Sequence, residues 1–215
     1  MFMELIIKLI TSYLLGSISG SMIVGKFSGV DIRSMGSGNA GGTNAFRTMG
    51  PKFAIIVLII DVLKGYLAVQ FVSHINFIEV NFDHNLQSEI LKICCGCGSV
   101  LGHVYPIFYN FKGGKGAGTM VGVLLALFPL GLLVCFLSWI VILVLSGYVG
   151  LSTIIAGIVL PIVTVLKYDG GIFSPFSIFS IIISMFIIFT HRSNIYRMIA
   201  GNENRFDKIM IFRKK

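Results

Sequence analysis

Long apolar stretches alternate with short polar segments along almost the whole chain. A helix needs about 20 apolar residues to cross a bilayer. Four stretches have about this length, and they cover residues 4–25, 52–73, 88–108 and 173–190. A further run from Ala117 to Leu166 contains 50 residues without a charged side chain or a histidine. This run is too long for two ordinary spanning helices and short for three.

The distribution of charge decides how the long run is divided. Lysine and arginine residues gather after the first, the third and the last apolar stretch, whereas residues 74–89 carry Glu79, Asp83 and Glu89 and neither lysine nor arginine. The positive-inside rule places the basic regions in the cytoplasm and the acidic segment outside.

An even number of crossings then separates Lys115 from His191, so the long run supplies an odd number. Breaks near 128–131 and 146–150 divide it into three short helices, at 116–129, 131–147 and 150–167. The pattern therefore predicts an all-α integral membrane protein with seven transmembrane helices in a single domain, 1–215. Its N-terminus is outside, its C-terminus is cytoplasmic, and its polar loops cluster on the cytoplasmic face.

Composition supports this class. The chain is 55% hydrophobic and 12% charged, whereas a soluble domain is about 25% charged. The net charge of +8 suits anionic lipid headgroups, and no solvated basic domain exists that would bind nucleic acid. Glu4 and Lys8 interrupt the first apolar stretch and no signal-peptidase-like site follows, so we expect a retained span.

The four cysteines lie in apolar runs, at Cys94, Cys95, Cys97 and Cys135, with no histidine at ligand spacing before His103. Small core residues are favoured over a zinc site or a disulfide. We expect no metal and no cofactor. Gly16 and Gly20 are spaced for close helix packing.

The first polar cluster is "GSGNAGGTNAFR", residues 36–47. Successive glycines allow backbone N–H groups to converge on an anion, and Arg47 offers a fork suited to phosphate. The candidate phosphate-binding residues here are Ser37, Gly38, Asn39, Ala40, Gly41, Gly42, Thr43, Asn44 and Arg47. A flexible connector is the alternative, and a dinucleotide fold is excluded because no βαβ unit surrounds the glycines.

The second cluster is "GHVYPIFYNFKGGKGAGT", residues 102–119. Lys112, Gly113, Gly114 and Lys115 again combine glycines with cations, without the spacing of a Walker A motif. The lysines are candidates for phosphate binding, and simple topology anchors are the alternative.

The third cluster is "HRSNIYRMIAGNENR", residues 191–205. On a helix, His191 and Asn194 share one face, so they can position or deprotonate a hydroxyl. A basic amphipathic helix lying on headgroups is the alternative. Deeper in the membrane, Asp61 and Lys64 can pair at i, i+3, either in support of the site or in direct chemistry.

Together these segments resemble the bacterial membrane-integral acyl-phosphate:glycerol-3-phosphate acyltransferase family, and "DVLKG" at 61–65 is also similar to a family segment. The resemblance covers nearly the whole chain. It implies a seven-helix enzyme of the bacterial cytoplasmic (inner) membrane with its site facing the cytoplasm. A fatty acyl group would pass from acyl phosphate to the 1-hydroxyl of glycerol 3-phosphate, giving lysophosphatidic acid and phosphate. We expect a functional monomer.

The resemblance also implies roles. Ser37, Arg47 and a lysine from Lys112 or Lys115 would hold substrate phosphates with the amides of 38–44 and of Gly113 and Gly114. His191 and Asn194 would orient the glycerol hydroxyl, and the base is either His191 or a phosphate oxygen of the donor. Supporting roles fall to Asp61, Lys64, His103, Ser152, Thr153 and Glu203.

One segment departs from the family pattern. Members commonly carry an Arg-Tyr-Val-Ser-like stretch at the turn after the fifth helix, whereas this chain has Ser146-Gly147-Tyr148-Val149-Gly150 without the arginine. Either Ser152 or Thr153 compensates, or the turn matters less here.

The main rival is a membrane transporter for small, phosphate-like anions. A transporter would line its path with polar groups at mid-membrane depth, and residues 117–166 offer almost none. A metal-dependent phosphotransferase would need several aspartates, which Asp61 alone does not supply. The sequence therefore favours an enzyme acting at the membrane interface.

Overall fold

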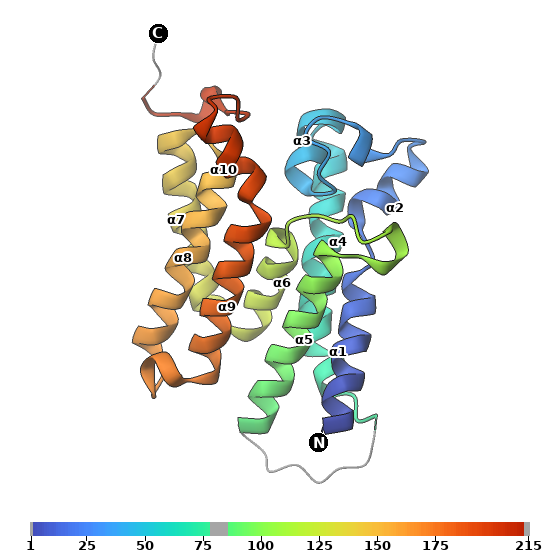
Figure 1. Cartoon of the computed structure of the whole chain (residues 1–215), viewed down its shortest axis with the longest axis vertical. Helices are drawn as coiled ribbons and strands as arrows, with labels where there is room; N and C mark the ends of the chain where they lie inside the picture. Colours follow the sequence, from blue (N-terminus) through green and yellow to red (C-terminus); the bar gives the residue numbers. More distant parts are fainter. Residues whose placement is uncertain (1, 78–85, 213–215) are drawn as a thin grey trace. The chain divides into compact units, whose positions relative to one another are not determined.

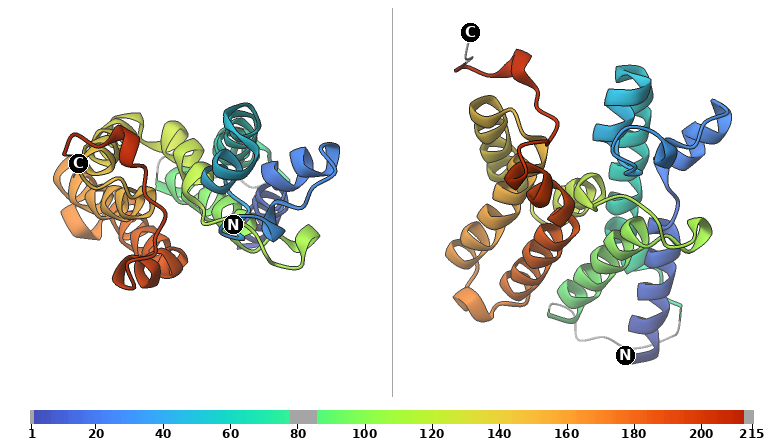
Figure 2. Two further views of the ribbon diagram at one scale, coloured as in Figure 1. Left: turned by 90° about the horizontal axis from the view of Figure 1, so that it is seen from above. Right: turned by 45° about the horizontal axis from the view of Figure 1, so that its top comes forward.

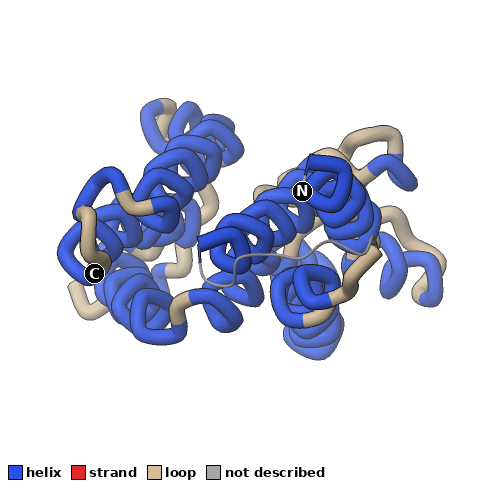
Figure 3. The backbone as a smooth tube through the Cα atoms, turned by 90° about the horizontal axis from the view of Figure 1, so that it is seen from below, coloured by secondary structure: helices blue, strands red, loops and turns tan. Residues whose placement is uncertain are grey.

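A computed structural model describes residues 2–77 and 86–212, and within these ranges the chain forms helices and no strands (Figure 3). The backbone divides into two compact units, an N-terminal unit, Met1–Leu127, and a C-terminal unit, Phe128–Lys215. Each unit is described by itself.

The N-terminal unit is built from six α-helices and three short 3-10 turns (Figure 1). α1 packs along α5, and α4 packs along α6 and α3. The helices are α1 (Phe2–Gly16), α2 (Gly20–Phe27), α3 (Gly42–Met49), α4 (Pro51–Gln70), α5 (Leu86–Val104) and α6 (Ala117–Leu127). The turns are η1 (Ile32–Ser34), η2 (Val72–His74) and η3 (Ile107–Tyr109).

In the C-terminal unit, α8 packs against both α7 and α9. Its helices are α7 (Pro129–Ser146), α8 (Val149–Lys167), α9 (Pro175–Thr190) and α10 (Arg192–Ile199), with turns η4 (Gly171–Phe173) and η5 (Asp207–Ile209). Pro129 and Pro175 stand in the first turn of their helices, where proline is tolerated because no amide donor is needed there. Ser174 caps α9 by accepting a hydrogen bond from the Ser177 amide at 3.1 Å.

The described helices confirm an all-α, multi-pass membrane protein. Five segments are long and apolar enough to cross a bilayer, namely Phe2–Phe27, Pro51–His74, Ser88–Tyr109, Pro129–Ser146 and Val149–Lys167. α9 and α10, bent by 51° at their junction, make a sixth when taken together. α6 extends only about 16 Å at 1.5 Å per residue, against a hydrocarbon core of about 30 Å. Seven crossings and their orientation therefore remain predictions.

The long uncharged run divides where the sequence predicts. α6 ends at Leu127 and α7 begins at Pro129, while Gly147 and Tyr148 separate α7 from α8. Gly147 ends α7 in the left-handed region at φ 73°, which glycine adopts without steric strain. Charge patterning and turn residues together located both breaks.

The first predicted span, 4–25, lies within one segment that is long and apolar enough to cross a bilayer, Phe2–Phe27, but this segment is not one continuous helix. α1 ends at Gly16 and α2 begins at Gly20. Two polar side chains of α4 form hydrogen bonds with the backbone at this break. Lys64 donates to the Ile18 carbonyl at 2.8 Å, and Asp61 accepts from the Gly20 amide at 3.4 Å. Contacts with α4 therefore stabilise a helix break that the length of the apolar stretch did not predict.

Close packing at the two glycines is confirmed. A Cβ at Gly16 would overlap with the Ser99 carbonyl of α5, and a Cβ at Gly20 would lie 2.8 Å from the Val57 carbonyl of α4. The four cysteines are free thiols, with Cys95 and Cys135 buried. Glu79 and Asp83 of the acidic segment, and the terminal cations Arg213, Lys214 and Lys215, lie outside the described residues.

Candidate active site

The first glycine-rich loop is packed into the core of the N-terminal unit. Ile32, Ala40 and Ala45 are completely buried, and they contact Phe53 and Val57 of α4 in one apolar cluster. Apolar residues on both sides of the glycines thus fasten the loop to α4. This excludes a loose connector.

Asn44 gives this loop its shape. Its side-chain oxygen accepts from the Ser37 amide at 2.9 Å, and its side-chain nitrogen donates to the carbonyls of Ile32 at 3.1 Å and Met35 at 3.0 Å. Gly36 has φ 55°, and a Cβ there would overlap with the Asn44 side-chain oxygen. Because these bonds engage both polar atoms of its side chain, Asn44 fits the predicted phosphate site through its backbone amide and not through its side chain.

The loop ends at the N-terminus of α3. Gly41 is the N-cap and supplies no side-chain cap, and Thr43 and Asn44 lie in the first turn. Amides of a first helical turn have no partner within the helix, and the helix dipole favours an anion beside them. Arg47 follows Thr43 at i, i+4 and so lies on the same face of α3. This end of α3 combines open amides, a hydroxyl and a guanidinium.

The second loop, residues 105–116, extends from α5 past the break between α1 and α2 (Figures 1 and 2). Three polar contacts anchor its first half, because the Tyr13 hydroxyl donates to the Tyr105 carbonyl at 2.7 Å, the Ile107 amide donates to Ser17 Oγ at 3.4 Å, and Arg33 Nη1 donates to the Tyr109 carbonyl at 3.2 Å. The loop is therefore held by both α1 and the segment before the first loop.

The second half of this loop presents lysines. Lys112 is exposed and Lys115 is half-buried. The amides of Gly113 and Gly114 donate to the carbonyls of Val104 at 3.2 Å and His103 at 3.1 Å. The expectation that these two amides face a phosphate does not fit these bonds, which extend the end of α5 instead.

Asp31 and Arg33 form an ion pair beside the loops. Arg33 donates to Asp31 from Nη2 at 2.8 Å and from Nε at 3.1 Å. The guanidinium holds the pKa of Asp31 below its ordinary value, and the carboxylate raises the pKa of Arg33. The pair orients Arg33 toward the Tyr109 carbonyl.

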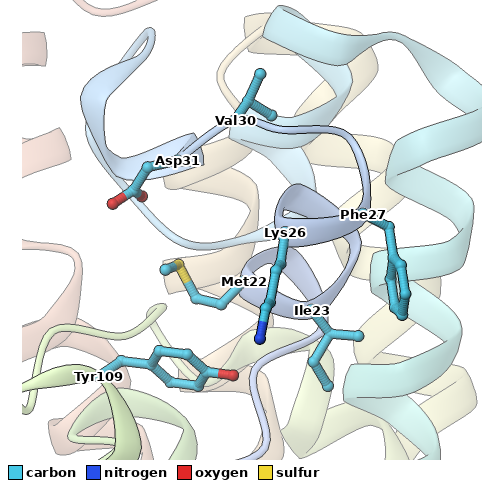
Figure 4. A pocket seen from close by; sticks show the side chains of 7 residues that line it. All are labelled: Met22, Ile23, Lys26, Phe27, Val30, Asp31 and Tyr109. Atoms are coloured by element: carbon cyan, nitrogen blue, oxygen red, sulfur yellow. The ribbon is translucent and has the colours of Figure 1, made fainter.

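A hollow of about 470 Å³ lies along α2 (Figure 4). Its lining is mainly apolar, with Lys26 extending in the direction of Tyr109 and Asp31 at the rim. The expected phosphate-binding residues are absent from its lining.

In the C-terminal unit, His191 stands at the junction of α9 and α10 and is 5% exposed. Its Nδ1 lies 2.8 Å from the Ile187 carbonyl. A carbonyl only accepts, so Nδ1 carries the proton in this contact and Nε2 of the neutral ring is the basic nitrogen. The junction thus presents an oriented imidazole at a helix end.

Glu203 connects the other polar residues of this motif. Its Oε1 accepts from Asn194 Nδ2 at 3.1 Å and its Oε2 accepts from Arg197 Nε at 2.6 Å. A Cβ at Gly150 would lie 2.8 Å from the Asn194 side chain. Asn194 is therefore held by Glu203 on one side and by the first turn of α8 on the other.

The turn between α7 and α8, which lacks the arginine of the family pattern, lies next to the guanidinium of Arg205. Arg205 Nε donates to the Ser146 carbonyl at 3.0 Å, and its guanidinium lies 5.4 Å from the centre of the Tyr148 ring. Ser152 and Thr153 donate to carbonyls one turn earlier in the chain, each at 2.9 Å. Both hydroxyls are thus engaged by the backbone at the start of α8, and the cation at this turn comes from the C-terminal segment.

Comparison with known proteins agrees with the motifs. The family model described as glycerol-3-phosphate acyltransferase matches residues 6–201. The chain belongs to this family. A glycerol-3-phosphate acyltransferase 2 of Bacillus anthracis is 44% identical over 93% of this chain and 98% of its own length. A glycerol-3-phosphate acyltransferase of Chlorobium phaeobacteroides is 37% identical over 94% of this chain and 97% of its own.

A crystal structure of the integral membrane glycerol 3-phosphate acyltransferase PlsY (YgiH), in its glycerol 3-phosphate form, matches with a TM-score of 0.81 at 36% identity, over 94% of this chain and 95% of that one. A lysophosphatidic acid form matches with a TM-score of 0.79 at 36% identity, over the same shares of the two chains.

The predicted site residues of this glycerol-3-phosphate acyltransferase family member therefore fall into two groups. The N-terminal unit holds Ser37, Arg47, Lys112 and Lys115 on or next to the two loops, and the C-terminal unit holds His191, Asn194 and Glu203. Sequence reasoning missed Arg205. The only signal for it was its place at the end of the third motif.

Proposed function

We propose that this membrane acyltransferase transfers a fatty acyl group from acyl phosphate to the 1-hydroxyl of glycerol 3-phosphate, giving lysophosphatidic acid and phosphate, with no metal required. The observation that carries the proposal is the pair of glycine-and-cation loops in the N-terminal unit. Acyl phosphate and glycerol 3-phosphate each carry a phosphate group, which accounts for two loops.

The phosphate-binding roles rest on the resemblance to the family and on the donors that the loops carry. Ser37, Arg47 and the first-turn amides of α3 hold one phosphate, because amides and a guanidinium suit its oxygens. On the second loop, the positive charge of Lys112 or Lys115 attracts the other phosphate.

The chemistry then needs little beyond orientation. The glycerol oxygen attacks the carbonyl carbon of acyl phosphate, the bond from carbon to the bridging phosphate oxygen breaks, and phosphate leaves. Acyl phosphate is a mixed anhydride with a good leaving group, so positioning and charge stabilisation supply most of the rate. Asn194, held by Glu203, orients the hydroxyl.

The hydroxyl proton passes either to His191 Nε2 or to a phosphate oxygen of the donor. His191→Gln distinguishes the two. A kcat within about tenfold of wild type, about 1.4 kcal/mol, assigns the proton to the phosphate, and a larger loss assigns it to the imidazole.

The topology is part of the proposal. We propose seven crossings, with α6 completed by its flanking residues, and both loops and the third motif facing the cytoplasm of a bacterial inner membrane. The concentration of cations next to these motifs supports this orientation. A C-terminal green fluorescent protein fusion is expected to fluoresce, whereas a C-terminal alkaline phosphatase fusion is expected to be inactive. The reverse pattern contradicts the orientation.

The donor is tested with purified protein, labelled glycerol 3-phosphate and one acyl donor at a time. We expect lysophosphatidate from palmitoyl phosphate, with no effect of a chelator and no dependence on an added thioester. Equal activity with palmitoyl-CoA would overturn the assignment of the donor. Movement of glycerol 3-phosphate or phosphate into sealed vesicles without acylation would favour the transporter.

A further inference from the structure

A buried polar cluster lies beneath the two loops of the N-terminal unit. Asp61 and Lys64 of α4 pair at 3.1 Å, and Asp61 also lies 3.4 Å from His103 Nδ1 of α5. All three side chains are at most 4% exposed. Charged groups at this depth are unfavourable unless their partners are fixed, so their geometry is well determined by their surroundings.

The far edge of the His103 ring supports the second loop. A Cβ added at Gly114 would overlap with His103 Nε2, so glycine is required for the loop to lie against the imidazole. The Gly114 amide also donates to the His103 carbonyl at 3.1 Å. The ring therefore fills the space between Asp61 and the glycine pair next to Lys112 and Lys115.

The other partners of the cluster lead to the first loop. Asp61 accepts from the Gly20 amide at 3.4 Å, and Lys64 donates to the Ile18 carbonyl at 2.8 Å, which fixes the break between α1 and α2. From this break, Ser21 donates to the Ala40 carbonyl of the first loop at 3.1 Å.

The two loops meet above the cluster. The Ala40 carbonyl lies 3.1 Å from the position that a Cβ of Gly114 would take. The two loops are therefore in close contact at Ala40 and Gly114, with the His103 ring packed against Gly114.

We propose that Asp61, Lys64 and His103 form a positioning cluster that fixes the loop at 112–116 against the loop at 36–44. The cluster acts through the loops and does not contact the substrates. This inference rests on the proposed function of the loops as phosphate-binding elements. His103, although buried, would thus affect substrate binding indirectly, by holding the second loop in place.

The test is a double-mutant cycle on the purified full chain, with Gly114→Ala, His103→Ala and the two together. The severe overlap at position 114 is with the imidazole, whereas the other close contact, at 3.1 Å from the Ala40 carbonyl, is the same in both backgrounds. We therefore expect Gly114→Ala to raise the KM of one substrate by about tenfold in the wild-type background, but by less than about twofold when residue 103 is alanine.

The cycle has a second signature. We expect His103→Ala to raise the KM of the same substrate as Lys112→Ala or Lys115→Ala does, with kcat within about threefold of wild type. A purely structural role would lower the amount of folded enzyme, and hence apparent kcat, without selecting one substrate. The proposal would be overturned if Gly114→Ala raised KM by the same factor with histidine and with alanine at position 103. It would also be overturned if His103→Ala lowered kcat without changing either KM.

Two matched controls are available. His74 is an exposed histidine beyond α4, and Gly157 of α8 has room for a Cβ in ordinary contact with Ile187 at 3.4 Å. We expect His74→Ala and Gly157→Ala to change each KM by less than about twofold. If His103→Ala does not fold in detergent, His103→Asn enters the cycle, since its amide is smaller than the imidazole and keeps a polar group beside Asp61.

The outcome separates this proposal from the proposed function. A wild-type enzyme inactive with palmitoyl phosphate overturns the assignment of the donor. The cycle is then measured with the acyl donor that the enzyme does use, on the KM of glycerol 3-phosphate and of that donor. Non-additivity there still supports the positioning cluster, and additivity overturns it.

Discussion

The N-terminal unit contains two buried carboxylate–lysine pairs with almost the same geometry and different neighbours. Glu4 and Lys8 pair at 3.2 Å and i, i+4, while Asp61 and Lys64 pair at 3.1 Å and i, i+3. In both pairs the side chains are at most 4% exposed.

The neighbours distinguish the two pairs. Lys8 donates to the Ser73 carbonyl at 2.6 Å and Glu4 accepts from the Phe77 amide at 3.2 Å, so this pair fastens α1 to the segment after α4. Asp61 instead contacts the break before α2 and His103, next to both loops. The first pair therefore joins α1 to the segment after α4, whereas the second belongs to the positioning cluster that we propose.

The largest expected effect is common to both pairs. Lys8→Met and Lys64→Met each remove the ammonium from beside a buried carboxylate, and we expect each to destabilise the protein by about 3–5 kcal/mol. Thermal unfolding in detergent measures the loss. A variant that unfolds within about 1 kcal/mol of wild type would show that the carboxylate is satisfied without its lysine.

Double variants that remove both charges of a pair distinguish the roles of the two pairs. Glu4→Gln with Lys8→Met, and Asp61→Asn with Lys64→Met, remove both charges and should recover most of the lost stability. We expect the first to keep both KM values within about twofold and the second to raise one KM by about tenfold. Equal kinetics in the two double variants would contradict the difference between the pairs.

The ion pair between Arg197 and Glu203 in the C-terminal unit is expected to have a smaller effect on stability and, through Asn194, an effect on kcat. Glu203 is buried and pairs with the partly exposed Arg197 at 2.6 Å. Glu203→Gln weakens a charge-assisted bond of about 1.5–3 kcal/mol and loosens Asn194. We therefore expect kcat to fall by about tenfold.

Arg192→Gln is the control for that variant, since Arg192 is an exposed cation of α10, the helix that carries Asn194 and Arg197, and its guanidinium lies over the Phe189 ring. We expect its kcat to stay within about twofold of wild type. If Glu203→Gln loses stability but keeps its kcat, Glu203 does not position a reacting group.

The smallest effect is expected for the exposed pair of Asp31 and Arg33. Because Arg33 lowers the pKa of Asp31 below 3.8, the stabilisation is present above that pH and is lost as the pH falls through the lowered pKa. For a pair this exposed the contribution is about 0–1 kcal/mol. Unfolding of wild type and Arg33→Gln at pH 7 and pH 3 measures it. If the difference in stability between wild type and Arg33→Gln is larger at pH 3 than at pH 7, the ion pair does not stabilise the protein in this way.

The helical content and most helix boundaries could be predicted because they depend on local patterns. Apolar length, charge placement and turn residues located α4, α5, α7, α8 and α9 and divided the uncharged run at Phe128 and Gly147. These features act within a few residues of where they appear.

Features set by distant partners could not be predicted. The break at 17–19 depends on Asp61 and Lys64, which are more than 40 residues away. The bonds of Asn44 to its own loop, and of Arg205 to the turn after α7, likewise leave no periodic trace. The motifs could name the residues of the candidate site, while only the fold shows which polar groups are already engaged.

The central claim is that the acyl group moves and the donor's phosphate leaves. The most direct test is the fate of the phosphate when palmitoyl phosphate labelled with ³²P is the sole acyl donor for glycerol 3-phosphate. The account predicts one labelled inorganic phosphate for each lysophosphatidate formed, and a lipid product without label. Label in the lipid, or lysophosphatidate formed without release of phosphate, would contradict it.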